Sequence, residues 1–304
     1  MGIQRHRARL DQQSPARRVE NLEAFEPCWL ETYQYALLNP LNIVPADRSG
    51  LPCQPLKTPG IKVREHLLPQ LLCLNALSGD QRKTLTTMVA EYCRRGTPFL
   101  SALLQSEATP AEIIGHFRFT LEQPRSGSKL RWWLRCYDPR VFRHLCWVLD
   151  ELRMDRLLGP ITAWAWPDLS GWWHRLPRGR ALDPWQRMPT LSKHQWAVID
   201  RVALLNATLD RLAMLAPEVR FSFEDYVWVD GLLAEARELG LTDAEDCRLY
   251  AEQAARFHPD IHDHPSLHQR LSEAIEQPGS YTQYCDDLSS QLLQAMAREL
   301  EKST

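Results

Sequence analysis

Residues 130–145 read LRWWLRCYDPRVFRHL and contain a clear change of periodicity. In the first eight residues, Leu, Trp, Leu and Cys alternate with Arg, Trp, Arg and Tyr, which is the period of a β-strand. Asp138 followed by Pro139 is typical of a helix N-cap and the first helical position. The stretch therefore predicts a strand that leads directly into an amphipathic helix over 141–152.

A second strand is predicted just before this one. Residues 117–122 also alternate, and the turn-rich sequence PRSGS follows them at 124–128. The two strands would form a β-hairpin with one cationic, aromatic face. That face would carry Arg131, Trp133, Arg135 and Tyr137.

This face has three interpretations. Arginine beside aromatic rings suits stacking against single-stranded nucleic acid. The same residue types are enriched in protein interfaces, and a helix of the same chain would also cover them. Arg140 lies in the first helical turn, where the helix dipole disfavours a cation, so we expect a partner or a carboxylate to hold it. Asp138 is the nearest such carboxylate.

Upstream of the hairpin, short apolar runs alternate with helical patterns. Ser78 with Gln81, and Thr109 with Glu112, have the spacing of capping boxes at helix starts. Strands are expected at 33–38, 65–74 and 98–104, and helices at 78–94 and 109–115.

The chain begins with a basic segment. Residues 1–20 contain five arginines and almost no apolar periodicity. We expect residues 1–29 to form a basic, mobile tail.

The second half of the sequence divides into two patterns. Nine of the eleven tryptophans lie between 132 and 196, and five of them, from Trp164 to Trp185, lie in a proline-rich segment that predicts irregular structure. Beyond it, capping signals at Ser192 and Thr242 and apolar periodicity predict helices. Those helices are expected at 192–216 and 222–239, from residue 242 onward, at 265–276 and at 281–300.

The predicted fold class is α+β. A mixed α/β module, with a β-sheet flanked by helices, is expected over 30–190, and an all-helical module over 191–304.

Charge is distributed unevenly over the 304 residues. Residues 217–304 contain 18 acidic and 7 basic side chains, a net charge of −11, and the first 216 residues carry +9. Opposite charges of this kind favour docking of the two modules as much as nucleic-acid binding. No run of about 18 apolar residues predicts a membrane span, and the eight cysteines form no C-x-x-C pair. We expect a soluble protein with reduced thiols.

Common enzyme motifs are missing from the sequence, so we predict a non-enzymatic protein without catalytic residues, cofactor or metal. The 13 glycines form neither a phosphate-binding loop nor a nucleophile elbow. The alternative is a metal-dependent enzyme, since FHPDIHDHPSLH at 257–268 contains zinc-type ligands. They are His258, His262, Asp263, His264 and His268. Pro265 more naturally starts a helix there, which favours a simple connection between helices.

Four stretches of the first module resemble one known family, the adaptors or chaperones of type VI secretion effectors. They are YALLNP at 35–40, PFLSALLQSEATPAEIIGHFR at 98–118, LRWWLRCYDPRVFRHL at 130–145 and LLGPITAWAW at 157–166. The family's tyrosine-aspartate-proline-arginine is matched at 137–140, and its glycine-proline at 159–160. Phe117 departs from the leucine that is usual between histidine and arginine. Residues 234–265 are similar to the helical tail of many such adaptors.

The resemblance implies a bacterial cytoplasmic protein that binds a toxic effector and helps load it onto the VgrG spike. Its partners would be the effector and VgrG, with no membrane and no nucleic acid. The expected partner-binding residues are Arg131, Trp133, Arg135, Tyr137, Asp138 and Arg140. The alternative of a single-stranded nucleic-acid binder would use the basic tail and the same hairpin.

Overall fold

The computed structural model describes residues 10–12, 14–180, 183 and 186–303. The chain divides into two compact units, Gln12–Ile199 and a second one in which Asp200–Thr304 is joined by Met1–Asp11; each is described separately below. The first contains a seven-stranded sheet with helices and the second is all-helical, so the predicted α+β class is confirmed. Among the described residues, no helix has the length and apolar character needed to cross a bilayer.

The sheet of the first unit is antiparallel at every pairing, in the order β1-β9-β8-β5-β2-β4-β3. Its central strands are buried on both faces, which explains their short, continuous apolar runs. The strands are β1 (Glu20–Ala24), β2 (Tyr35–Leu38), β3 (Cys53–Pro55), β4 (Gln70–Cys73), β5 (Ala102–Gln105), β8 (Ala163–Pro167) and β9 (Trp172–Pro177).

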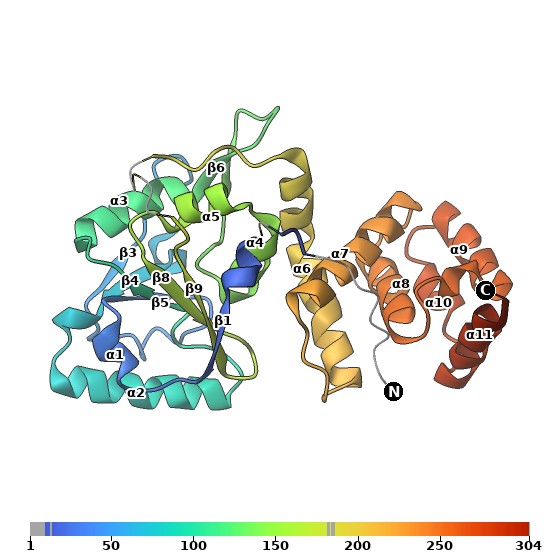
Figure 1. The fold of residues 1–304 in the computed structure, drawn as a ribbon, viewed down its shortest axis with the longest axis horizontal. Helices are drawn as coiled ribbons and strands as arrows, with labels where there is room; N and C mark the ends of the chain where they lie inside the picture. The colour runs from blue at the N-terminus through green and yellow to red at the C-terminus, as the bar shows by residue number, and fades with distance from the viewer. Residues whose placement is uncertain (1–9, 13, 181–182, 184–185, 304) are drawn as a thin grey trace. The chain divides into compact units, whose positions relative to one another are not determined.

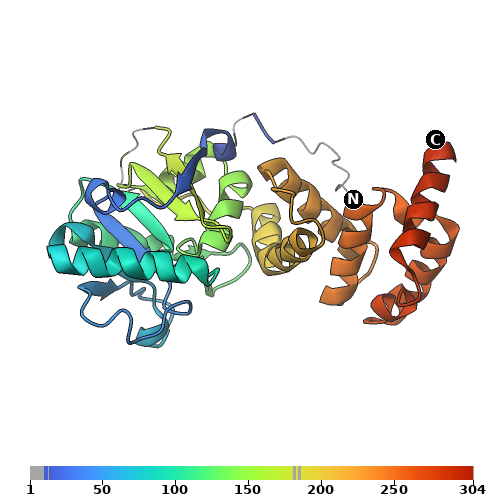
Figure 2. The same ribbon diagram turned by 90° about the horizontal axis from the view of Figure 1, so that it is seen from below.

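Helix α2 (Gly79–Arg94) covers one face of the sheet and lies in front of it in Figure 2. Ser78 and Gln81 form the predicted capping box at its start. Leu85, Val89 and Tyr92 then pack against alternate residues of the central strands, because one side of a strand presents every second side chain.

The opposite face is covered by α3 (Pro110–Thr120), α4 (Pro139–Val148) and α5 (Glu151–Leu158); Figure 1 shows α3 and α5 above the sheet. Trp164 of β8 stacks on Phe142 of α4 with ring centroids 4.4 Å apart. Phe117 of α3 meets the same indole edge-on. Aromatic burial of this kind contributes strongly to a core.

The tryptophan-rich region is therefore not irregular as predicted. Its residues 163–167 and 172–177 form the β8–β9 hairpin, with Trp164 and Trp166 fully buried. Pro167 and Pro177 are the last residues of their strands, where a missing amide N–H does little harm to the ladder. Trp185 lies outside the described residues.

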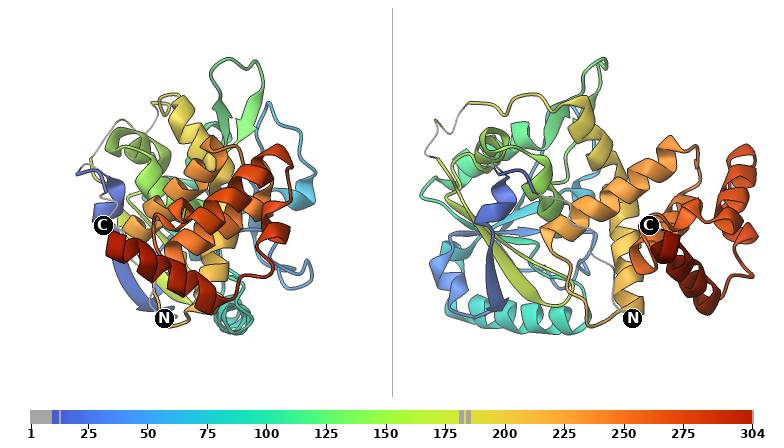
Figure 3. Two further views of the ribbon diagram at one scale, coloured as in Figure 1. Left: turned by 90° about the vertical axis from the view of Figure 1, so that its right-hand side faces the viewer. Right: turned by 45° about the vertical axis from the view of Figure 1, so that its right-hand side comes forward.

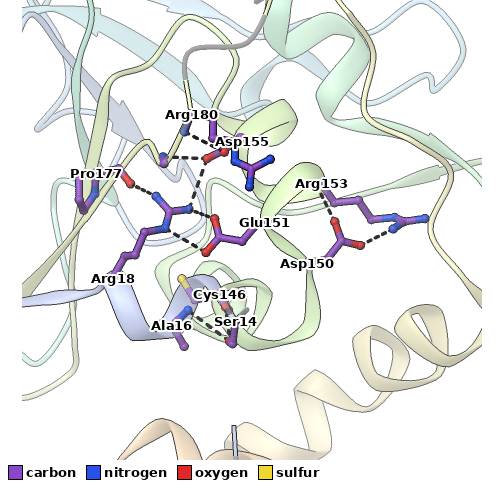
Figure 4. A network of polar contacts seen from close by, with 11 residues as sticks. Ser14, Ala16, Arg18, Cys146, Asp150, Glu151, Arg153, Asp155, Pro177 and Arg180 are labelled. Carbon is purple, nitrogen blue, oxygen red and sulfur yellow. Dashed lines mark hydrogen bonds and ion pairs between the residues drawn. The ribbon is translucent and has the colours of Figure 1, made fainter. Parts of the chain in front are cut away.

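The predicted tail over 1–29 is wrong for residues 14–24. The 3-10 helix η1 (Pro15–Arg18) and the edge strand β1 lie in the first unit, with β1 paired to β9. Arg18 bonds both carboxylate oxygens of Glu151 and also contacts Asp155, as Figure 4 shows. Residues 1–9 and 13 lie outside the described part. Two further 3-10 turns and a short helix complete the unit: η2 (Glu65–Leu67), η3 (Leu74–Ala76) and α1 (Trp29–Thr32).

Two predicted strands start later than expected. The segment 65–74 becomes strand only from residue 70, because Pro69 lacks the N–H needed to extend the ladder. The segment 98–104 becomes strand at 102, after Phe99 and Leu100 have packed into the core as loop residues.

The elements of the second unit that the structure describes are all helical, and Figure 3 shows them from two sides. The cap of the third helix is Asp243, whose carboxylate accepts from Glu245 N and Asp246 N, and not Thr242 as predicted. The stretch 281–300 contains two helices instead of one. The elements are α6 (Lys193–Leu215), within which the two units divide, α7 (Phe223–Glu238), α8 (Ala244–Arg256), η4 (Ile261–Asp263), α9 (Pro265–Glu276), α10 (Tyr281–Tyr284) and α11 (Ser290–Ser303).

Candidate protein-binding site

The stretches that carry the family resemblance meet inside the first unit. His116 Nε2 lies 2.8 Å from the carbonyl oxygen of Leu157, and burial lowers the pKa of this histidine. Gly159 adopts φ +55°, and its Cα faces the His116 ring so closely that a Cβ would lie 2.3 Å from it. Ser106 donates a hydrogen bond to the Pro160 carbonyl. His116, Gly159 and Pro160 thus pack together, and we call this group the packed frame.

The predicted hairpin exists but is shorter than expected. Strands β6 (Glu122–Pro124) and β7 (Arg131–Trp133) form a separate two-stranded sheet. The strand predicted over 117–122 is wrong, because α3 continues past Gly115 to Thr120 and buries Phe117 on its helical face. Figures 1 and 3 show the loop between β6 and β7 projecting from the unit.

Arg131, Trp133, Arg135 and Tyr137 do not share one strand face, since β7 ends at Trp133. Arg131 and Arg135 are exposed, while Trp133 is half-buried and donates from Nε1 to the hydroxyl of Tyr137, 3.3 Å away. Tyr137 is buried, and burial raises its pKa. Arg140 is half-buried in the first turn of α4.

Asp138 has the predicted structural role. Its Oδ1 accepts a hydrogen bond from Arg140 N at 3.0 Å, which caps α4. Its Oδ2 accepts from the Arg135 guanidinium at 2.9 Å. The carboxylate therefore organises the turn between β7 and α4.

We expect Asp138→Ala to lower the free energy of unfolding by about 1 kcal/mol, since a lost N-cap costs about that much and an exposed ion pair adds little. Asp138→Asn keeps a cap oxygen and should recover most of the loss. Urea unfolding of both variants measures this. Equal losses in the alanine and asparagine variants would contradict the capping role.

The other face of the hairpin carries a cation–π cluster. The Arg125 guanidinium lies 4.9 Å from the Trp132 ring centroid and 5.3 Å from that of Trp196, at the start of α6. Leu130, the residue before β7, is 70% exposed. The hairpin thus presents apolar and cationic groups to solvent.

A groove of about 620 Å³ opens beside the hairpin; we name it the arginine groove. The half-buried Arg156 is held by the Asp183 carbonyl and Gln186. The exposed Arg187 lies over the Phe119 ring at 4.5 Å. The charged residues that line the groove are Arg118, Arg131, Arg156, Arg187 and Glu122.

Sequence reasoning found only Arg131 of this groove. The other arginines come from α3, from α5 and from the segment after residue 185, which are far apart in the chain. No local spacing indicates that they converge. Phe119, which also lines the groove, was assigned to a strand.

The histidines of 257–268 have structural roles. His262 is buried, stacks on Tyr250 with centroids 3.6 Å apart and lies 3.2 Å from Gln253 Oε1. His264 caps α9, whose first residue is Pro265 as predicted. Within the described part of the chain, no group of three or more histidine, cysteine, aspartate or glutamate residues is placed to hold a metal ion.

We predict that His262 makes the second unit sensitive to acid. Burial lowers its pKa from 6.5 to about 3, so the unfolded chain takes up a proton first as the pH falls. The contribution of the neutral His262 to the free energy of unfolding is complete above about pH 6.5. It is lost toward about pH 3, at about 1.4 kcal/mol per pH unit.

His262→Phe keeps a ring against Tyr250 and removes this titration. Between pH 6.5 and 5, wild type should therefore lose about 2 kcal/mol more stability than the variant. Urea unfolding followed by circular dichroism at the two pH values measures the difference. Parallel pH dependences would exclude a neutral, buried His262 as the cause.

Comparisons with protein-family models, curated proteins and solved structures gave no match to this chain. The functional assignment therefore depends on the residues and surfaces described above.

Proposed function

We propose that the chain is a non-enzymatic adaptor, or chaperone, of a bacterial type VI secretion system. It would act in the cytoplasm, bind a toxic effector protein and help load it onto the VgrG spike. Neither a membrane nor a nucleic acid would be a partner. Two exposed arginines of the expected site, Arg131 and Arg135, would face the effector.

One observation carries the proposal. The stretches that resemble the adaptor family pack together as a frame, in which His116 contacts Leu157 and faces Gly159. The frame supports a projecting hairpin with exposed cationic and apolar groups, among them Leu130 and Trp132. Arginine and tryptophan are the residue types that contribute most to protein interfaces. A surface of this kind, held by a packed frame, fits a protein that binds another protein.

Deletion of the gene in its own bacterium tests the proposal. Proteome-wide mass spectrometry of cells and culture medium would compare the deletion strain with a complemented strain. We expect one effector to lose its export and to fall in cellular abundance, because an unbound client is degraded more readily. Unchanged abundance and export of every type VI effector, in cells that fire the system, would contradict the proposal.

A further inference from the structure

We infer that the arginine groove binds an acidic, extended segment of the effector protein. Among the described residues that line the groove, four are arginines, while Glu122 supplies the one carboxylate. Glu122 accepts from Gly60 N at 2.8 Å, and its other oxygen lies 3.9 Å from Arg131 Nε. Its charge is thus partly used within the fold, and the groove keeps an excess of positive charge.

Two of the arginines are well placed to receive a carboxylate. Arg118 is exposed on α3, and the Arg131 side chain, on β7, is 48% exposed. The guanidinium fork matches a carboxylate in a bidentate geometry, which makes such pairs stronger than ordinary hydrogen bonds. An acidic side chain beside either arginine would complete this geometry.

An aromatic ring in the groove lining indicates what else the segment carries. Phe119 is 48% exposed there, beneath the Arg187 guanidinium. An apolar side chain next to the acidic residues would cover this ring and strengthen the ion pairs by excluding water. The groove therefore fits a peptide that combines acidic and apolar residues.

A nucleic acid fits the groove less well. Base stacking needs an open aromatic face beside the phosphate contacts. Here Trp132 lies next to Arg131 in a strand, so its side chain points to the opposite face, where it meets Arg125 and not the groove.

The inference rests on the proposed function for the identity of the partner, so the experiment separates the two. The full chain, the groove variant Arg118→Gln/Arg131→Gln and the control variant Arg94→Gln/Arg95→Gln would be tested for effector binding by calorimetry. The control removes the same charge from exposed arginines at the end of α2. Two labelled probes, a glutamate–phenylalanine peptide and a thymidine oligonucleotide, would be titrated alongside.

We expect the groove variant to bind the effector and the glutamate peptide at least about tenfold more weakly, with the control unchanged, since one lost charged hydrogen bond of about 1.4 kcal/mol corresponds to tenfold. The interaction should also weaken as salt is added. Equal effector binding by wild type and groove variant would overturn the inference and leave the adaptor proposal standing. No effector binding by wild type would instead count against the adaptor proposal.

If the wild-type chain binds no effector, the glutamate–phenylalanine peptide still tests whether the arginine groove binds an acidic ligand. Peptide binding that the groove variant loses would support an acidic ligand, and no peptide binding would overturn it. Oligonucleotide binding that the groove variant loses, with no peptide binding, would assign the groove to nucleic acid. Melting temperatures of all variants would show whether each is folded.

Discussion

Gly159→Ala is expected to destabilise the first unit by at least about 3 kcal/mol. The glycine has φ +55° and ψ −115°, a conformation that costs other residues about 1–3 kcal/mol. An added Cβ would also lie 2.3 Å from the His116 ring. Displacing that ring would break its hydrogen bond to the Leu157 carbonyl, a further loss of about 1–3 kcal/mol for a buried group.

Gly115→Ala is the matched control in the same unit. Gly115 lies within α3, and a Cβ there would meet nothing within 4 Å. Because alanine favours helix over glycine by about 1 kcal/mol, this variant should be neutral or more stable. Thermal unfolding of both variants makes the comparison. Equal melting temperatures would show that the contact between Gly159 and His116 has no structural importance.

Asp155→Ala is expected to have a comparably large effect, about 3–5 kcal/mol. This carboxylate is 1% exposed and accepts hydrogen bonds from Gly179 N at 2.9 Å and Arg180 N at 3.0 Å. It also pairs with Arg18 at 3.3 Å, which ties η1 to α5 and to the end of β9 (Figure 4). Removing it leaves a guanidinium and two amide groups without this acceptor.

Glu151→Gln provides the control, because Glu151 bonds the same Arg18 guanidinium but is 30% exposed. Pairs of that kind contribute at most about 1 kcal/mol. Asp155→Asn, which keeps one acceptor oxygen, should fall between the two. Urea unfolding gives all three values. A loss below about 1 kcal/mol in Asp155→Ala would contradict the role assigned to this buried carboxylate.

Local signals predicted much of the fold. The starts of α2, α3 and α4 were found correctly, because Ser78, Thr109 and Asp138 bond amides only two or three residues away. Interactions of that range are visible in the sequence. The end of α3 was misjudged because Gly115 was interpreted as a helix stop, although the packing of Phe117 carries the helix further.

Long-range packing explains what the sequence could not predict. Strand β1 was assigned to a tail because its pairing partner, β9, lies about 150 residues later. Asp138 lies at the predicted N-cap, while its bond to Arg135 depends on how the turn before α4 folds. The arginine groove was missed since its arginines converge only through the tertiary fold.

The most direct test of the adaptor proposal is affinity capture of the tagged full chain from its own bacterium, with partners identified by mass spectrometry against an untagged strain. We expect VgrG and one large effector to be enriched together. Enrichment of neither, in cells that express the secretion system, would contradict it.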